Sequence, residues 1–378
     1  MSVVNTSSQG FTAQSSGVAS GSRKSACFEI DYFYYIVSIV SISIKNVAQK
    51  AGVSLGTVSN AINRPELLAP ETLRKVQKAI DALGFVPNAS ARTLRDGKTR
   101  VLGLIVPDIS NPFFAELSKG VSDAALAAGY VVILCNTDEN SNKEEKYIGV
   151  LASQNVRGIL ITPARDSNKS LAAISSRGIG LTLVDRAITG IDACSVAVDD
   201  AIGGALALKH LWELGHRKIL LLTGATDIPQ VYARETGINT AILEIAKIDR
   251  PTIKKIQIRQ MSTTSAGEAL TAYVLENGLD FTAVICGNDL VALGAIRSLK
   301  ELNHQVPQDV SIIGYDDIDF AASAKVPLTS IAQPKYQLGL AAAELVIEEC
   351  ENPASHVHKT IVFQPQLVVR ESTTNARH

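Results

Sequence analysis

The chain has few cysteines, and they lie far apart in the sequence: Cys27, Cys135, Cys194, Cys286 and Cys350. No CxxC pair or other metal-ligand spacing occurs among them. A disulfide framework needs patterned cysteines in an oxidising compartment, so this scattered set indicates reduced thiols in a cytosol. Cys135, Cys194 and Cys286 stand in apolar runs, and we expect them to be small core residues.

Long hydrophobic runs are also absent from the N-terminal region. Residues 32–42 form an apolar stretch of 11 residues, whereas a helix needs about 20 residues to span a bilayer. Acidic residues precede this stretch and no small-residue cleavage site follows it, so a secretory signal is a poor fit. The segment before it is rich in Ser, Gly and Thr, which favours disorder. We expect residues 1–43 to be a flexible extension, or else to reflect a start codon placed too far upstream, with Val37 or Val40 as the true start.

Signatures of catalysis are missing as well. We expect no G-x-S-x-G nucleophile elbow, no GxxxxGK phosphate loop and no metal-ligand cluster in this chain. His304, His356 and His358 stand as isolated histidines, and His216 is expected to have a structural role. The sequence therefore predicts no catalytic residues, no cofactor and no metal site.

The charge of the chain is distributed unevenly. The formal net charge is −1 at pH 7, yet residues 44–100 contain ten Lys/Arg and four Asp/Glu, a net charge of +6. Residues 101–378 contain 24 basic and 31 acidic residues, a net charge of −7. A small basic segment beside an acidic body is typical of a protein that binds the phosphate backbone of nucleic acid.

Two short helices joined by a tight turn are predicted over residues 44–63, IKNVAQKAGVSLGTVSNAIN. Gly52 can leave the first helix with a positive φ, because it has no Cβ. Ser54 can begin the second helix by accepting a hydrogen bond from the amide of Thr57 or its neighbour. This arrangement places one helix in the DNA major groove in helix-turn-helix proteins. An ordinary corner between two core helices is the alternative.

The outward face of the second helix is small and polar, which suits contacts with bases and phosphates. Its members are Ser54, Leu55, Gly56, Thr57, Ser59, Asn60 and Asn63, and we expect all of them to contact DNA. Gly56 has no side chain that can read a base. Base discrimination is therefore expected from Leu55, through thymine methyl groups, from Asn60 and from DNA shape.

A third helix and a basic segment follow. Pro70 can open the third helix and Gly84 can end it. Within residues 87–100, Leu94 stands between Arg92 and Arg95 in a helical segment too short to be stable alone. An apolar residue flanked by arginines suits insertion into the minor groove. The alternative is a plain linker.

Residues 42–372 resemble the LacI/GalR family of bacterial transcription regulators, and the motifs follow the family's order and spacing. The matching segments are VAQKAGVS, TVSNAIN, the PET helix start, GFVPNASARTL, DISNPFF, LVDR, VDD, HLWELGHRKI, RETG, GNDLVALGA and GYDDIDFA. Independently of this resemblance, apolar runs alternate with amphipathic stretches after residue 100, a pattern typical of parallel sheets with helical crossovers. The predicted strands cover 101–106, 130–135, 157–162, 180–185, 218–223, 282–287 and 310–315.

The resemblance implies an α/β fold. A three-helix helix-turn-helix headpiece (44–86) and a hinge segment (87–100) would precede a two-lobed, periplasmic-binding-protein-like body with parallel sheets (101–372) and a short tail (373–378). Lobe one would comprise about 101–199 and 332–362, and lobe two about 200–331 and the C-terminal end.

The resemblance also implies an effector site at the carboxyl ends of the strands, where ligands of such sheets bind. Asp185, Arg234, Asn288 and Asp316 match the family's effector contacts, and Arg186 and Phe113 lie beside the same site. The alternative role for Arg186 is an ion pair with an acidic neighbour. The alternative for Phe113 is a position in the hydrophobic core. Residues 260–263 lack the aromatic side chain that often stacks on the ligand in this family. Carboxylate, amide and guanidinium groups suit a sugar or polyol, and a nucleoside or nucleobase remains open.

These features predict a sequence-specific DNA-binding regulator, of the repressor type, in the bacterial cytoplasm and associated with the nucleoid. Its expected partners are a pseudo-palindromic double-stranded operator, a small polar effector and a second copy of the chain. No membrane partner is expected. The C-terminal end lacks the leucine heptads of a four-chain coiled coil, so we expect a homodimer. A solute-binding receptor without a role on DNA is the less favoured alternative.

Overall fold

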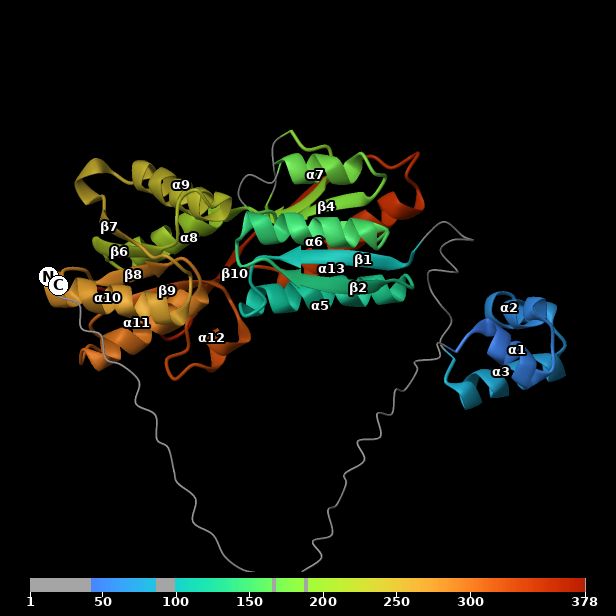
Figure 1. The fold of residues 1–378 in the computed structure, drawn as a ribbon. Helices are drawn as coiled ribbons and strands as arrows, with labels where there is room; N and C mark the ends of the chain where they lie inside the picture. The colour runs from blue at the N-terminus through green and yellow to red at the C-terminus, as the bar shows by residue number, and fades with distance from the viewer. Residues whose placement is uncertain (1–41, 86–98, 165–167, 187–189, 378) are drawn as a thin grey trace, which may run out of the picture. The chain divides into compact units, whose positions relative to one another are not determined.

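The computed structural model describes residues 42–85, 99–164, 168–186 and 190–377 (Figure 1). The predictions for residues 1–41, and those for Arg92 and Leu94 in the hinge segment, lie outside the described residues. The chain forms two compact units that divide after residue 88.

The first unit is a three-helix headpiece, and its predicted turns are confirmed. Its elements are α1 (Ile44–Ala51), α2 (Leu55–Asn63), the 3-10 turn η1 (Pro65–Leu67) and α3 (Pro70–Leu83). Gly52 ends α1 with φ 66° and Gly84 ends α3 with φ 61°. Ser54 Oγ accepts the amide hydrogen of Thr57 at 3.1 Å, which satisfies a free amide in the first turn of α2.

The headpiece core is small and apolar. Val47 of α1, Val58 of α2 and Val76 of α3 are fully buried and belong to one cluster. Burying such a side chain contributes about 1.5–3 kcal/mol relative to leaving it in water. These valines therefore hold the three helices together and leave the opposite side of α2 exposed.

Lobe one of the body is built on a six-stranded sheet in the order β11-β5-β4-β3-β1-β2. The strands are β1 (Val101–Val106), β2 (Val131–Asn136), β3 (Gly158–Ile161), β4 (Gly180–Val184), β5 (Cys194–Val198) and β11 (Thr360–Phe363). All of their pairings are parallel. Helices α5 (Pro112–Ala127) and α13 (Lys335–Glu351) pack on one face, and α6 (Ser141–Ser153) and α7 (Asn168–Ser175) pack on the other.

Lobe two repeats this plan with a second six-stranded sheet in the order β12-β10-β9-β8-β6-β7. The strands are β6 (Lys218–Thr223), β7 (Thr252–Gln257), β8 (Ala283–Cys286), β9 (Ser311–Asp316), β10 (Thr329–Ala332) and β12 (Gln366–Val368). Helices α8 (Asp200–Glu213) and α9 (Pro229–Glu244) cover one face, and α10 (Thr263–Asn277) and α11 (Asp289–Glu301) cover the other (Figure 1). The short elements η2 (Lys247–Asp249) and α12 (Asp319–Ser323) complete the lobe.

The two-lobed α/β fold is as predicted, with one departure from parallel pairing. β12 pairs antiparallel with β10. The chain enters β12 directly from β11 of the other sheet, with only residues 364–365 between the two strands. β11 runs parallel to β5, its neighbour in the first sheet. Because the chain continues almost directly into the second sheet, β12 runs antiparallel to β10 there. Among the described helices, none is both long and apolar enough to cross a membrane.

The close approach of α8 and α9 positions part of the site described below. A Cβ on Gly237 would lie 1.8 Å from the Ala201 carbonyl oxygen, and one on Gly204 would lie 2.1 Å from the Arg234 carbonyl oxygen. Only glycine lets the two backbones touch at these points. As a result, Asp200 at the start of α8 reaches Arg234 on α9.

Candidate DNA-binding surface and effector site

The predicted DNA-contacting face lies on the outer side of α2. Leu55 is 45% exposed, and Ser54, Gly56 and Asn60 are also exposed. Thr57, Ser59 and Asn63 are half-buried. Asn63 Nδ2 donates to the Ser59 carbonyl oxygen at 2.7 Å, so part of its donor capacity is used within the helix. The DNA contacts of these residues stay predictions.

Asn60→Ala should weaken binding to the selected operator by about 1–3 kcal/mol and leave binding to random duplex almost unchanged, because an Asn amide can make a paired contact with adenine. Anisotropy titrations of labelled duplexes at one salt concentration measure both affinities. Equal weakening on the two duplexes would show that Asn60 contacts only the backbone.

The segment 52–56 fits the letters G-x-S-x-G, so the expectation that this pattern is absent needs a correction. A nucleophile elbow places its serine between a strand and a helix. Here Ser54 stands between two helices and caps α2. The resemblance to a catalytic motif is therefore one of letters only.

The predicted effector residues gather at the carboxyl ends of strands in both sheets. Asp185 follows β4, Asn288 follows β8 and Asp316 ends β9. They are 8%, 4% and 4% exposed respectively. Asp185 and Asp316 have positive φ values of 65° and 102°, a strained conformation for a residue with a Cβ and one that concentrates at functional sites.

Arg234 belongs to a buried charged group with two residues that sequence reasoning missed. Its Nε donates to Asp200 Oδ1 at 2.7 Å and its Nη1 donates to the Gly287 carbonyl oxygen at 2.6 Å. Its guanidinium lies 3.6 Å from the centroid of the Tyr315 ring, and Tyr315 Oη donates to Asp200 at 2.9 Å. Burial lowers the pKa of Arg234, but Asp200 and Tyr315 outweigh it and raise the pKa above its ordinary value.

Gln230 links the two lobes, and it too was missed. Its Nε2 donates to Asp185 Oδ2 at 2.6 Å and its Oε1 accepts from Arg186 Nε at 2.8 Å. Gln230 is in the first turn of α9 in lobe two, whereas Asp185 and Arg186 follow β4 in lobe one. These bonds fix the carboxyl ends of the two sheets against each other.

The side chain of Arg186 is otherwise used within lobe one. Its Nη2 lies 2.6 Å from Glu139 Oε1, and its Nη1 donates to the Pro163 carbonyl oxygen at 2.6 Å. The acidic partner foreseen as its alternative role is therefore present. Contact between Arg186 and the effector stays a prediction.

Asp316 is held by residues at the crossing between lobes. Gln333 Nε2 donates to Asp316 Oδ1 at 2.7 Å. Lys335 Nζ, in the first turn of α13, donates to the carbonyl oxygens of Asp316 at 3.0 Å and Asp317 at 2.8 Å. No spacing in the sequence marks Gln333 or Lys335, because their contacts arise only when the chain returns to lobe one.

Two other predicted effector residues have structural roles in the described part of the chain. Asn288 Oδ1 accepts the amide hydrogen of Val291 at 2.9 Å and caps α11. Phe113 is 2% exposed in the core of lobe one, edge-to-face with Phe114 at 5.0 Å between ring centroids. Their contact with an effector stays a prediction, and for Phe113 the structure favours the core position.

Several buried oxygens at the strand ends lack a hydrogen-bond partner within the described residues. They are Thr162 Oγ1 after β3, Asp185 Oδ1 after β4 and Gln333 Oε1 after β10. A buried polar atom without a partner costs about 1–3 kcal/mol. A ligand that supplies hydroxyl groups would satisfy these oxygens.

Asp185→Asn should flatten the pH dependence of stability. Burial, reinforced by Asp200, raises the pKa of Asp185 to about 6, whereas an unfolded Asp titrates near 3.9. The folded state thus holds the proton more tightly, and the wild-type free energy of unfolding falls as pH rises from about 4 to 6. Relative to wild type, Asp185→Asn should gain about 2 kcal/mol between pH 4.5 and pH 7. Urea unfolding at the two pH values tests this, and an unchanged difference would contradict it.

The prediction of a structural role for His216 is confirmed, whereas the prediction that His356 and His358 are isolated is wrong. His216 is structural: it is 2% exposed and bonds with Thr282 at 2.8 Å and Ser311 at 3.1 Å. His356 and His358 are not isolated, because their ligand nitrogens and a Glu349 oxygen lie within 4.8 Å of one another. Pairing of β11 with β5 folds the segment after α13 back onto the helix end, which the sequence spacing did not reveal.

Each of the two units of the chain matches the model of a known protein family. Residues 43–88 match the family model described as "Bacterial regulatory proteins, lacI family". Residues 99–365 match the model described as "Periplasmic binding proteins and sugar binding domain of LacI family".

Similar proteins extend over most of the chain. The chain is 35% identical to an HTH-type transcriptional repressor PurR of Photobacterium profundum, over 87% of this chain and 98% of the relative. It is 36% identical to the PurR repressor of Photorhabdus laumondii, over 88% and 97% of the respective chains. A ribose-bound LacI family regulator of Enterococcus faecium is 30% identical with a TM-score of 0.66, over 73% of this chain and 100% of that one. The chain therefore belongs to the LacI family of bacterial regulatory proteins.

Proposed function

We propose that the chain is a transcriptional repressor that binds a pseudo-palindromic operator as a homodimer and is controlled by a sugar or polyol bound between its lobes. In this proposal the headpiece is 44–86, the hinge is 87–100 and the effector-binding body is 101–372. The outer face of α2 reads the major groove. The repressor acts in the bacterial cytoplasm, at the nucleoid where its operator lies.

The unpartnered oxygens of Thr162, Asp185 and Gln333 are the observation that carries the effector proposal. They can act as acceptors at the carboxyl ends of strands from both lobes, and Asp185 lies close enough to Asp316 to contribute to its raised pKa. Vicinal hydroxyl groups donate to such acceptors in pairs. The ribose bound by the Enterococcus faecium regulator supports the same ligand class.

A nucleoside or nucleobase is the second candidate, because relatives that are 35% and 36% identical over 87% and 88% of the chain carry the name PurR. Recognition of a flat ring is strongest where an aromatic face is free to stack. In this chain Arg234 covers the ring of Tyr315, Phe113 is buried in the core, and residues 260–263 contain no aromatic side chain. These features favour hydroxyl recognition over ring stacking.

The Gln230 contacts suggest how an effector would act on the operator. A ligand that bonds with Asp185 competes with or reinforces the link between Gln230 and lobe one, and so shifts the population of lobe arrangements. That shift would order or release the hinge, in which Leu94 flanked by Arg92 enters the minor groove.

A thermal-shift screen of the full chain against pentoses, hexoses, polyols, nucleosides and nucleobases tests the ligand class. A ligand at 100 times its dissociation constant stabilises the folded state by about 2.7 kcal/mol. We expect a sugar or polyol to raise the melting temperature, with calorimetry giving one site per chain. A rise with nucleobases alone would replace the sugar proposal by the second candidate.

A further inference from the structure

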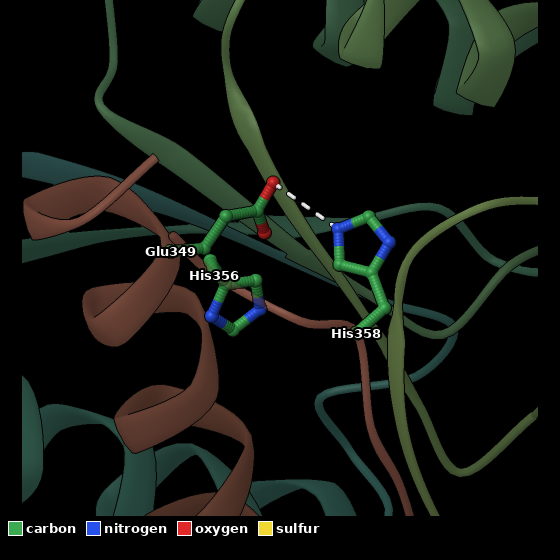
Figure 2. Close-up of side chains that lie close together, drawn as sticks. All are labelled: Glu349, His356 and His358. Carbon is green, nitrogen blue, oxygen red and sulfur yellow. Dashed lines mark ion pairs between the residues drawn. The ribbon is translucent and has the colours of Figure 1, made fainter. Parts of the chain in front are cut away.

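A cluster of ligand-type side chains lies on lobe one, away from the effector site. Glu349 is in the last turn of α13, and His356 and His358 are in the segment between α13 and β11 (Figure 2). Leu181, at the amino end of β4, donates its amide to Glu349 Oε2 at 3.0 Å. The cluster thus lies at the amino ends of the strands, whereas Asp185 marks the carboxyl end of β4.

The three side chains converge. One ligand atom from each lies within 4.8 Å of the other two, and His358 Nε2 is 3.7 Å from Glu349 Oε1. The two imidazole centroids are 5.4 Å apart. Zinc bonds of about 2.0–2.1 Å in a tetrahedron place ligand atoms about 3.3 Å apart. Small side-chain rotations would close the triangle around an ion.

His358 is oriented in the way that metal-ligating histidines usually are. Its Nδ1 lies 2.7 Å from Asp192 Oδ1, a carboxylate that can hold the proton on this nitrogen. The lone pair is then on Nε2, which faces Glu349 (Figure 2). A carboxylate behind the imidazole fixes the tautomer and raises the basicity of the ligating nitrogen.

His356 supplies a buried nitrogen that has no hydrogen-bond partner within the described residues. Its side chain is 2% exposed, and its Nδ1 makes no hydrogen bond within the described residues, with Glu348 Oε1 at 3.8 Å. The other nitrogen, Nε2, lies 3.1 Å from Cys194 Sγ at the start of β5. A buried imidazole nitrogen that makes no hydrogen bond is costly unless a ligand reaches it.

We propose that Glu349, His356 and His358 bind Zn²⁺, with Asp192 orienting His358 and with water in the fourth position. Two imidazoles with a carboxylate suit zinc rather than Mg²⁺, which prefers oxygen ligands alone. A cavity of about 530 Å³, lined in part by these residues, admits the ion from solvent.

The ion would have a structural role. It would join the C-terminal end of α13 to the segment that enters β11, and through Leu181 and Cys194 to the adjacent strands β4 and β5. These strand ends are on the side of the sheet where β1 begins at Val101. Zinc would therefore stabilise this end of lobe one, away from the effector site at the opposite strand ends.

Calorimetric titration of the metal-free full chain, carrying no histidine tag, tests the site with ZnCl2. We expect one Zn²⁺ per chain with a micromolar or tighter dissociation constant, a rise in melting temperature, and no comparable binding of MgCl2. His356→Gln and His358→Gln should each weaken zinc binding at least tenfold. His304→Gln, which changes a half-buried histidine of lobe two, is the matched control and should bind as wild type does.

Glu349→Gln separates the loss of zinc binding from a folding defect. Glutamine removes the charge but keeps an oxygen that can accept from the Leu181 amide. This variant should melt near the wild-type temperature without metal and lose most of the zinc-induced rise. Cobalt gives a second readout: Co²⁺ should produce the strong visible absorption of a low-coordinate site in wild type and His304→Gln, and not in His358→Gln. Zinc affinity that is equal in wild type and both histidine variants, or only millimolar in wild type, would overturn the proposal.

Discussion

Arg234→Met is expected to lower the free energy of unfolding of lobe two by about 3–5 kcal/mol, because it leaves a buried charge without its partner. Arg234 and Asp200 are 13% and 6% exposed, and their side chains meet at 2.7 Å. Methionine fills similar volume, so the loss would come from Asp200 and from the Gly287 carbonyl oxygen, which would also lose its donor. Tyr315 would keep one hydrogen bond to Asp200, which does not neutralise the carboxylate.

The single tryptophan makes this measurement specific. Trp212 lies on α8 and bonds with Asp249 at 3.1 Å, so its fluorescence in urea reports the unfolding of lobe two. Lys209→Met on the same helix is the matched control, since the Lys209–Glu244 pair is 47% and 57% exposed and such pairs contribute about 0–1 kcal/mol. Adding Asp200→Asn to Arg234→Met should recover part of the loss. If the Arg234 and Lys209 variants unfold within 1 kcal/mol of each other, the buried pair does not stabilise the lobe as described.

Asp316→Asn should reduce effector affinity about 10- to 100-fold and leave operator affinity unchanged. A hydrogen bond to a charged group contributes about 1.5–3 kcal/mol, and asparagine retains only one carboxylate-like oxygen. Asn tolerates the positive φ of this position, and its oxygen can still accept from Gln333. Burial raises the pKa of Asp316 to about 6, so the wild-type side chain is mainly ionised at pH 7.

Asp319→Asn is the control for Asp316, because Asp319 is exposed in the first turn of α12. Calorimetry with the effector found in the thermal-shift screen gives both affinities. Equal affinity in wild type and Asp316→Asn would remove Asp316 from the effector site. A loss in Asp319→Asn of the same size would point to a general effect of charge.

The elements that could be predicted from the sequence are those governed by local chemistry. Gly52, Ser54 and Gly84 fix helix ends through their own φ values and hydrogen bonds, so α1, α2 and α3 were predicted close to their observed bounds. Strands such as β1 and β6 are continuous apolar runs, which parallel pairing buries on both faces.

Five strands were not predicted: β5, which reads CSVAV, is a short apolar run that was missed, and the other four have weaker local patterns. β7 reads TIKKIQ, with its lysines on an edge strand, and β10, β11 and β12 have three or four residues each. Their strand conformation depends on pairing with neighbours distant in sequence. The antiparallel direction of β12 follows from the crossing of the chain between the two sheets. A local stretch of sequence carries no information about that crossing.

The same limit applies to the sites. Asp185 and Asp316 were predicted because they follow recognisable strands. Gln230, Gln333 and Lys335 were missed because their partners lie in the other lobe or across a crossing. Glu349, His356 and His358 were likewise read as unrelated, since only the return of β11 to β5 brings them together.

The most direct test of effector-controlled operator binding is one anisotropy titration, with a labelled operator selected from random duplexes and the full chain added with and without saturating effector at constant salt. We predict that the effector changes operator affinity at least about tenfold, a coupling free energy of about 1.4 kcal/mol. Asp316→Asn should need about 10- to 100-fold more effector than wild type for the same change in operator affinity. Operator affinity that stays the same while calorimetry shows the effector bound to the wild-type chain would contradict coupling between the cleft and the headpiece.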